Sequence, residues 1–220
     1  MVHGGSTVDR KRLRQINARQ RQKRLGKSAR NRVLHAQDEI DRLSLLLSIP
    51  EKAREGSLEI YREAWENDLI HGRSIETILA ATIYLACRKH KVPRTLDEIE
   101  DVTNVRRTDI IKTCKILAKK LGMKLAPASP LEYVSAFCAK LNLKQPIEER
   151  ARKIIDAALE INIISGRSPT SIAAAAIYMA ITLSDGMTTQ KDVADATGVT
   201  GVTLRARYKE LVRKLGTKIE

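Results

Sequence analysis

Aromatic residues and cysteines are scarce in this chain of 220 residues, which has one Phe, one Trp, five Tyr and three Cys. So few aromatics argue against a protein that binds single-stranded nucleic acid by stacking bases on aromatic rings. The three cysteines lie far apart, form no CxxC pair, and join none of the four histidines at ligand spacing. We therefore expect no metal site, and the odd cysteine count fits a reducing compartment.

Long apolar runs are missing as well. The longest, from Ile172 to Leu183, is shorter than the roughly 20 residues that cross a bilayer, and it is typical of a buried core helix. The N-terminus is charged without an apolar segment, so we expect no signal peptide and no membrane partner. No run alternates like a strand. We therefore predict an all-α protein of the cytoplasm, or of the nucleus if its source is eukaryotic. We expect no enzyme, because the sequence offers no Ser/His/Asp group, paired histidine or phosphate loop after a strand.

Positive charge is abundant and uneven. The net charge is +14, and residues 1–32 hold eleven Lys and Arg against one acid, Asp9. This excess predicts a polyanionic partner. The same segment has helical propensity but only a thin apolar stripe (Leu13, Ile16 and Leu25), so we expect it to order only on a partner. A solvated linker is the alternative.

The chain repeats itself from about Asp38. A shift of 94 residues places Ile60 on Ile154 and Ile70 on Ile164 without a gap. The match is clearest where residues 71–74 (HGRS) fall on 165–168 (SGRS) and residues 80–86 (AATIYLA) fall on 174–180 (AAAIYMA). Such identities indicate a duplicated domain. We divide the chain into a basic tail over residues 1–32, a first repeat over 33–125 and a second over 126–220.

Each repeat is expected to form five helices, which in the first copy cover about 35–48, 52–69, 75–90, 96–103 and 107–121. The third is apolar nearly all round, so the others should bury it. Ser74 and Ser168 are the predicted caps of this helix in the two copies. Gly72 is predicted to end the helix before it. Thr95 and Glu98 have the spacing of a capping box for the fourth helix.

Residues 189–215 have the pattern of a helix-turn-helix. Thr189 caps its first helix with Asp192 as capping-box partner, Gly198 supplies a left-handed turn, and Thr200 caps the second helix. The second helix should run from residue 202 to 215, with a buried stripe of Leu204, Tyr208, Leu211 and Leu215. Arg205 is expected on the face opposite this stripe, and Glu210 is the only acid of the helix. In such a motif this helix enters the major groove by its N-terminal end. An ordinary helical hairpin with a solvated basic face is the alternative.

The two repeats resemble the cyclin-like core of archaeal transcription factor B, the counterpart of eukaryotic general transcription factor IIB. The resemblance rests on Gly166–Pro169, Ile172–Ala180, Thr189–Lys191, Gly198–Val199 and Val202–Arg205, and in the first copy on Tyr84–Arg88 and Val92–Thr95. The family usually carries an N-terminal zinc ribbon that docks on RNA polymerase. The cysteines for it are absent here. We therefore expect no cofactor, and either a truncated form or a divergent paralogue.

The resemblance implies a monomeric transcription initiation factor. Its partners would be the TATA-binding protein, double-stranded promoter DNA on both sides of the TATA box, and RNA polymerase, with the second repeat recognising an upstream element. We assign to DNA binding Thr200, Gly201, Val202, Thr203, Arg205, Arg167, Gly72 and Arg73. Candidates for contact with the TATA-binding protein are Arg106, Arg107 and Lys112. Candidates in the tail for polymerase or DNA contact are Arg12, Arg14, Arg21, Lys23 and Arg24.

Alternatives stay open for several of these positions. Gly72 and Arg73 also fit a helix end with a solvated arginine, since Gly166 and Arg167 make the same turn. Arg106 and its neighbour could simply be solvated. The alternative function is a cyclin-like protein-interaction regulator without sequence-specific DNA binding. Such a regulator needs an apolar groove rather than a basic recognition helix and a basic tail.

Overall fold

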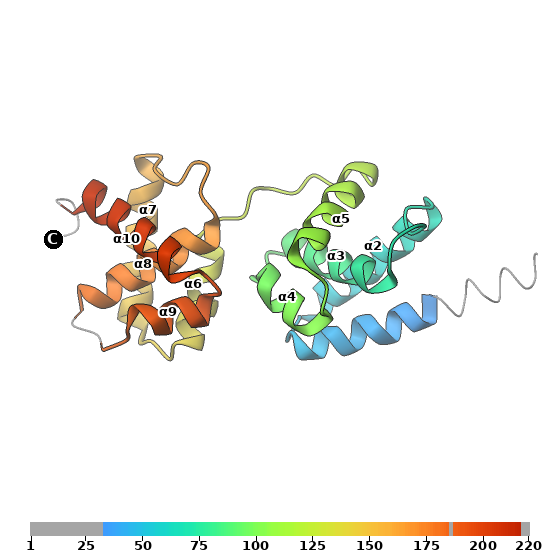
Figure 1. Ribbon diagram of the computed structural model, residues 1–220, viewed down its shortest axis with the longest axis horizontal. Helices are drawn as coiled ribbons and strands as arrows, with labels where there is room; N and C mark the ends of the chain where they lie inside the picture. Colours follow the sequence, from blue (N-terminus) through green and yellow to red (C-terminus); the bar gives the residue numbers. More distant parts are fainter. Residues whose placement is uncertain (1–32, 185–186, 217–220) are drawn as a thin grey trace, which may run out of the picture.

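The computed structural model describes residues 33–184 and 187–216 of the chain. These residues form helices joined by short turns, and no strand occurs among them. Figure 1 shows two groups of helices, one from each half of the sequence, joined by the segment over residues 121–130. The predicted all-α class with two tandem five-helix repeats is confirmed.

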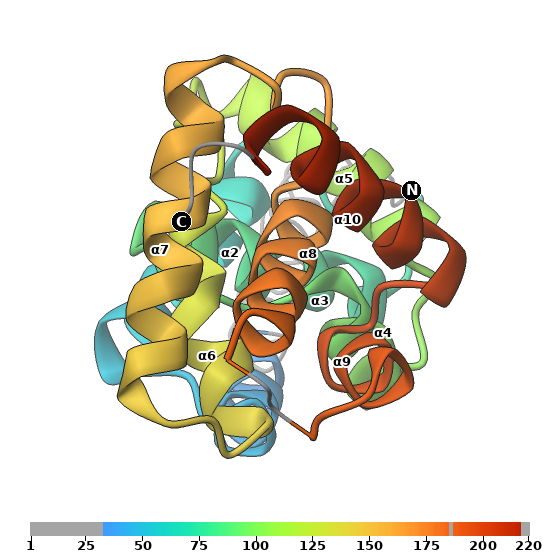
Figure 2. The same cartoon turned by 90° about the vertical axis from the view of Figure 1, so that its left-hand side faces the viewer.

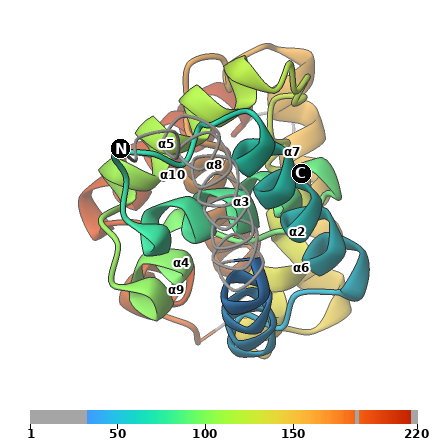
Figure 3. The same ribbon diagram turned by 90° about the vertical axis from the view of Figure 1, so that its right-hand side faces the viewer.

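The first repeat surrounds one apolar helix. Its elements are a helix over the described residues 33–46, then α2 (Glu51–Glu66), α3 (Ile75–Lys89), α4 (Leu96–Thr103) and α5 (Arg107–Lys120). Nine of the 15 residues of α3 are buried, including neighbours such as Ile78, Leu79 and Ala80. A helix apolar on every side can only be stable when others cover it, and Figure 3 shows α3 within its group.

The second repeat has the same plan. Its elements are α6 (Leu131–Lys140), α7 (Gln145–Glu160), α8 (Pro169–Thr182), α9 (Gln190–Thr197) and α10 (Gly201–Leu215). Ten of the 14 residues of α8 are buried, and the consecutive residues Ala173–Ala176 have no exposed surface. Methyl side chains keep a helix narrow, so neighbours can approach it closely on all sides. Figure 2 shows α8 between α7 and α10.

The backbone repeats with the same period as the sequence. Adding 94 to the bounds of α2 and of α4 gives the bounds of α7 and of α9. The left-handed turns recur too: Gly72 (φ 78°) matches Gly166 (φ 72°), and Asn104 (φ 54°) matches Gly198 (φ 69°). Asn is the residue that adopts this conformation most readily after Gly, which explains the exchange.

Each repeat has its own apolar core. One cluster of buried residues runs from Ala36 to Leu117, the other from Tyr133 to Leu215, and they share no residue. The segment between them is fixed to the first repeat by Arg88, whose Nη2 donates to the carbonyl oxygen of Ala126 at 2.5 Å. The division of the chain at residues 125 and 126 stays a prediction.

Most of the predicted helix starts are confirmed. The Ser74 hydroxyl accepts a hydrogen bond from the backbone N–H of Thr77. Thr95 and Glu98 form both bonds of a capping box. These bonds satisfy N–H groups that have no partner within the helix.

Two predictions about helix ends are wrong. Ser168 stands before α8, but its hydroxyl makes no cap bond; it exchanges a hydrogen bond with the Thr170 hydroxyl at 2.7 Å instead. Pro169 follows directly, and a proline at the first position leaves one N–H fewer to cap. Gly72 does not end α2. That helix ends at Glu66, because the chain turns left-handed at Asp68 (φ 57°).

Candidate nucleic-acid interface

The first helix of the predicted helix-turn-helix, α9, is fixed by its cap and by two buried side chains. The Thr189 hydroxyl accepts from the Asp192 backbone N–H at 3.2 Å, and the Asp192 carboxylate accepts from the Thr189 backbone N–H at 2.8 Å. Hydrogen bonds from Thr189 lower the pKa of Asp192, which keeps the carboxylate charged. Val193 and Thr197 are buried against the rest of the repeat.

The turn after α9 depends on Gly198. Its φ of 69° lies in the left-handed region, where a side chain is strained. Val199 follows and is buried, with 8% of its surface exposed. A β-branched side chain anchored after the glycine fixes the direction in which the next helix leaves the turn.

The second helix, α10, is joined to α9 at its first residue. Thr200 caps it by accepting from the Thr203 backbone N–H at 3.3 Å. The Gln190 side-chain amide, from α9, donates to the carbonyl oxygen of Gly201 at 2.9 Å. The first bond caps α10, and the second joins the N-terminal end of α10 to α9. The predicted Thr200 cap is therefore confirmed, and the helix begins at Gly201 rather than Val202.

The inner face of α10 is close to the predicted stripe. Leu204, Leu211 and Leu215 are buried, with at most 1% of their surface exposed. Tyr208 is only half-buried, and its ring packs edge-on against Tyr178 of α8, with ring centroids 5.0 Å apart. Helical spacing alone could not show whether Tyr208 is fully buried or lies at the edge of the core, since both positions fit the same spacing.

The outer face of α10 carries the predicted DNA contacts. Val202 is 79% exposed, and Thr203 and Arg205 are exposed beside it. One expectation needs correction: Arg205 does not lie opposite the buried stripe. At about 100° of rotation per residue it lies on the flank next to Leu204. The outermost stripe is formed by Val202, Ala206, Lys209 and Arg213.

Arg167 is brought to α10 from a distant part of the chain. Its Nη2 donates to Glu210 Oε1 at 3.0 Å, and Arg207 pairs with the other oxygen of the same carboxylate. The hydrogen bond from Arg167 is the largest cause of the lowered pKa of Glu210, and the charges of both arginines add to it. The sequence singled out Glu210 only as the lone acid of this helix.

Gly72 and Arg73 form the corresponding turn of the first repeat. Gly72 is exposed, its φ is 78°, and a Cβ added there would meet no atom within 4 Å. The backbone angle, and not crowding, therefore requires glycine at this position. Arg73 is half-buried, and its Nη1 donates to the carbonyl oxygen of Leu69 at 2.9 Å. The turn borders a small cleft lined in part by Trp65 and His71.

Comparison with known proteins identifies the family. Residues 29–120 and 123–214 each match the family described as "Transcription factor TFIIB repeat". This chain belongs to the TFIIB-repeat family.

Several curated relatives carry the name "Transcription initiation factor IIB". The relatives from Methanoculleus marisnigri and Archaeoglobus fulgidus are each 44% identical over 214 residues, or 97% of this chain, which covers 64% and 66% of their lengths. The relative from Methanocaldococcus jannaschii is 44% identical over 210 residues, or 96% of this chain, which covers 31% of that relative's length. The chain thus spans about two thirds or less of these relatives. Among solved structures, a viral cyclin from herpesvirus saimiri matches with 14% identity, 84% coverage of both chains and a TM-score of 0.37, too low to support an inference.

In the first TFIIB repeat, the basic side chains at the start of α5 are paired with acids. Arg106 and Lys112 both contact Asp109, at 3.0 and 3.9 Å. Arg107 Nη1 lies 2.9 Å from Asp97 Oδ1, at the start of α4. The three predicted cations therefore lie on one surface, but each already has a carboxylate partner. The sequence showed Asp109 nearby, whereas the approach of Asp97 depends on the angle between α4 and α5.

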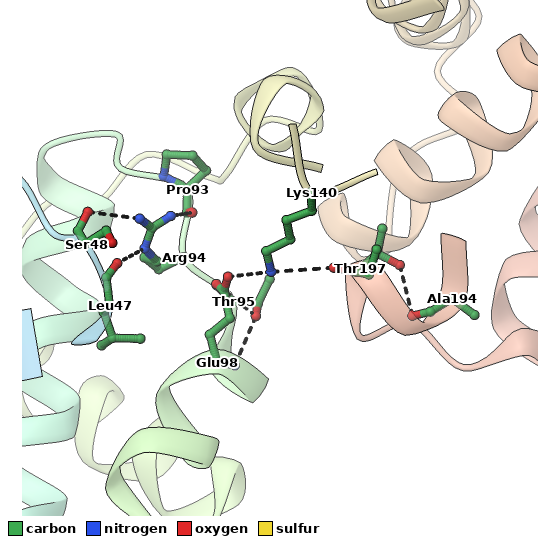
Figure 4. A network of polar contacts seen from close by, with 10 residues as sticks. Leu47, Ser48, Pro93, Arg94, Thr95, Glu98, Lys140, Ala194 and Thr197 are labelled. Atoms are coloured by element: carbon green, nitrogen blue, oxygen red, sulfur yellow. Dashed lines mark hydrogen bonds and ion pairs between the residues drawn. The ribbon is translucent and has the colours of Figure 1, made fainter. Parts of the chain in front are cut away.

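The two TFIIB repeats touch where α4 meets the ends of α6 and α9. Lys140 Nζ lies 2.7 Å from Glu98 Oε1 and 3.5 Å from the carbonyl oxygen of Ala196 (Figure 4). Burial of Glu98 is the largest influence and raises its pKa. The hydrogen bonds from Lys140 and from the Thr95 backbone, with the charges of Lys140 and Arg94, outweigh it, so the pKa falls below its ordinary value of 4.5. No local pattern in the sequence indicates this contact, because Glu98 and Lys140 lie 42 residues apart.

Some predictions fall on residues that the structure does not describe, and others state that a feature is absent. The tail candidates Arg12, Arg14, Arg21, Lys23 and Arg24 lie outside the part of the chain that the structure describes. Within the described part, no group of three or more His, Cys, Asp or Glu is placed to hold a metal ion. No helix among these residues is long and apolar enough to span a membrane. All three cysteines are buried and unpaired.

Proposed function

We propose that this chain acts as a general transcription initiation factor that binds promoter DNA flanking the TATA box together with the TATA-binding protein. The second repeat recognises an upstream element in the major groove through the N-terminal end of α10. Membership of the TFIIB-repeat family and the archaeal relatives named as initiation factors support this role.

The observation that carries the proposal is the exposed N-terminal end of α10. Val202 and Thr203 present methyl groups there, and Arg205 adds a guanidinium on the adjoining flank. Methyl groups suit the thymine methyl, and an arginine can donate two hydrogen bonds to a guanine edge. Single exposed apolar side chains are common on protein surfaces, so the support comes from the combination of Val202, Thr203 and Arg205 at one helix end.

The remaining contacts are assigned by position. Gly72 and Arg73 form an exposed turn in the first repeat, where the backbone of a glycine can approach a groove wall closely and an arginine suits a narrow minor groove. Arg106, Arg107 and Lys112 form the surface proposed to contact the TATA-binding protein. Their aspartate partners are exposed or half-exposed, so these pairs are weak and can be exchanged for an acidic partner surface. The tail over residues 1–32 is proposed to meet RNA polymerase or DNA.

Two variants on two duplexes test this function. Arg205→Ala should cost about 1–3 kcal/mol of binding on the preferred upstream sequence and little on a duplex with that sequence scrambled. Lys191→Ala, on the exposed surface of α9, should weaken both duplexes alike if it touches a phosphate. Gel shifts at fixed salt, with and without the TATA-binding protein, give these affinities.

Two results would contradict the proposal. Equal loss on both duplexes for Arg205→Ala would make α10 a basic surface without sequence recognition. Affinity that does not change when the TATA-binding protein is added would indicate a conventional repressor. A chain that binds neither DNA nor the TATA-binding protein would support the alternative, a cyclin-like protein-interaction regulator.

A further inference from the structure

A polar contact joins the two TFIIB repeats, whose apolar cores share no residue. We call it the inter-repeat joint. In the first repeat it consists of Asp97 and Glu98, at the start of α4, and in the second of Lys140, Ala196 and Gly198. Lys140 is the last residue of α6, whereas Ala196 and Gly198 lie at the end of α9. The joint therefore reaches the helix-turn-helix of the second repeat at the turn between its two helices.

The Lys140 ammonium links α4, α6 and α9. Its Nζ lies 2.7 Å from Glu98 Oε1 and 3.5 Å from the carbonyl oxygen of Ala196 (Figure 4). Carbonyl groups in the last turn of a helix lack intrahelical partners and carry partial negative charge, so a cation is favourable there. Glu98 Oε2 accepts from the Thr95 backbone N–H at 2.7 Å, and the Glu98 side chain is 23% exposed. The carboxylate is thus held on its own helix while it binds the lysine.

Asp97 connects the joint with the surface proposed to contact the TATA-binding protein. Its Oδ1 pairs with Arg107 Nη1 at 2.9 Å. Its side chain also lies against Gly198, because a Cβ built on this glycine would come within 3.0 Å of Asp97 Oδ2 and 3.6 Å of Asp97 Cβ. The turn of the helix-turn-helix therefore packs on an aspartate whose partner belongs to the proposed protein-binding surface.

The duplication shows that helix capping does not explain the lysine pair. Asp192 forms in α9 the capping box that Glu98 forms in α4, and it does so while exposed to solvent. The first-repeat residue that corresponds to Lys140 is Leu46, so the repeat itself does not require a lysine at this position. The Lys140–Glu98 pair is thus a feature of the contact between the repeats.

We propose that Lys140 is a positioning residue that holds the helix-turn-helix in a fixed place relative to the first repeat, and so couples binding of the TATA-binding protein to DNA binding by α10; this inference rests on the proposed function. Two domains that share no large apolar interface are expected to move relative to each other. A joint that restrains this motion lowers the entropy lost when both repeats enter one complex. Binding at the first repeat then raises the affinity at the second, and the reverse holds by the same factor.

Lys140→Ala tests the proposal, and the chain offers a matched control, Arg152→Ala. The Lys140–Glu98 pair has a distance of 2.7 Å and side-chain exposures of 41% and 23%; the Arg152–Glu148 pair has 2.9 Å and 39% and 27%. Each variant removes one positive charge and one ion pair of similar exposure from the second repeat. Lys140 reaches the first repeat, whereas Arg152 bonds Ser135 and Glu148 of its own repeat.

The measured quantity is the factor by which the TATA-binding protein raises affinity for the promoter duplex, taken as the ratio of dissociation constants without and with that protein at fixed salt. Lys140→Ala should lower this factor by about threefold to fivefold, the range for a partly exposed ion pair. Arg152→Ala should leave it unchanged. Lys140→Arg keeps the charge and should restore it. Affinity without the TATA-binding protein should be the same for the two alanine variants, because they have the same charge.

Glu98→Gln provides a second variant from the other side of the joint, since glutamine also serves in a capping box. Glu98→Gln alone, and combined with Lys140→Ala, should lower the factor as much as Lys140→Ala does, because the pair acts as a unit. Losses that add in the double variant, or a factor for Lys140→Ala equal to that of Arg152→Ala, would refute the role of the joint. If the TATA-binding protein does not raise the affinity of the unaltered chain, the proposed function fails and the coupling fails with it.

A distance measurement tests the positioning by itself, without any partner. Spin labels can be attached through Arg62→Cys on α2 and Glu160→Cys on α7, two exposed positions, because the three native cysteines are buried. Lys140→Ala should broaden the distribution of distances between the labels, and Arg152→Ala should not. An unchanged distribution for Lys140→Ala would refute the positioning role, whatever the outcome for the proposed function.

Discussion

Gly198 and Gly201 lie three residues apart in the helix-turn-helix, and the same change to alanine should affect them in opposite directions. Gly198 has a φ of 69°, whereas Gly201 is the first residue of α10 and has ordinary helical geometry. A Cβ at Gly201 would meet only the Gln190 amide at 3.8 Å, an ordinary contact. A Cβ at Gly198 would approach the Asp97 carboxylate to 3.0 Å.

The magnitudes follow from these geometries. A non-glycine residue in the left-handed region costs about 1–2 kcal/mol. The Asp97 carboxylate can move, but it is paired with Arg107 at 2.9 Å, so displacing it adds a smaller cost. Alanine at Gly201 restricts the unfolded chain and should stabilise the fold by about 0.5 kcal/mol. The two variants should therefore differ by about 2 kcal/mol in free energy of unfolding.

Urea denaturation followed by far-UV circular dichroism measures this difference. Gly198→Asn is the matched control, because Asn104 occupies the corresponding turn of the first repeat with a φ of 54°. It should recover part of the stability that Gly198→Ala loses. Equal stabilities of the two alanine variants, or a stabilising Gly198→Ala, would refute the reasoning. If Gly201→Ala is stable yet binds promoter DNA less tightly, its glycine serves close approach to DNA.

Two further predictions concern charge and burial. Glu98→Gln keeps the cap of α4 but removes the charge opposite Lys140, so it should cost less than about 1 kcal/mol at neutral pH, both side chains being partly exposed. Since the folded pKa of Glu98 lies below 4.5, the contribution of the pair is present above this value and is lost as pH falls through the folded pKa. Unfolding midpoints of variant and wild type should converge at acidic pH; a constant difference would contradict this. Burial raises the pKa of the Cys87 and Cys114 thiols to about 12. A thiol-specific reagent at mildly alkaline pH should modify them only at the rate of unfolding, and rapid modification of the native protein would show that the cores open locally.

Much of the fold follows from the sequence because its signals are local. The capping boxes at Thr95 and Thr189 involve residues three positions apart, and the left-handed turns need Gly or Asn at one position. The sequences of α3 and α8 are apolar on nearly every side, which predicts that both helices are buried. The period of 94 residues then transfers each assignment from one repeat to the other. Local signals compete at helix ends, and there the prediction failed: α2 ends at Glu66, before Gly72, and the Ser168 hydroxyl bonds Thr170.

Only the tertiary structure decided which charged side chains meet. Arg167 reaches Glu210 across 43 residues of sequence, and Lys140 reaches Glu98 across 42. The sequence contains both cations among many others, and nothing local distinguishes them. Ion pairs over such separations depend on the angles at which helices pack, which apolar contacts over whole helix faces determine. The sequence therefore determined the helices, the duplication and the exposed end of α10, while the packing of α8 against α10 placed Arg167 beside Glu210.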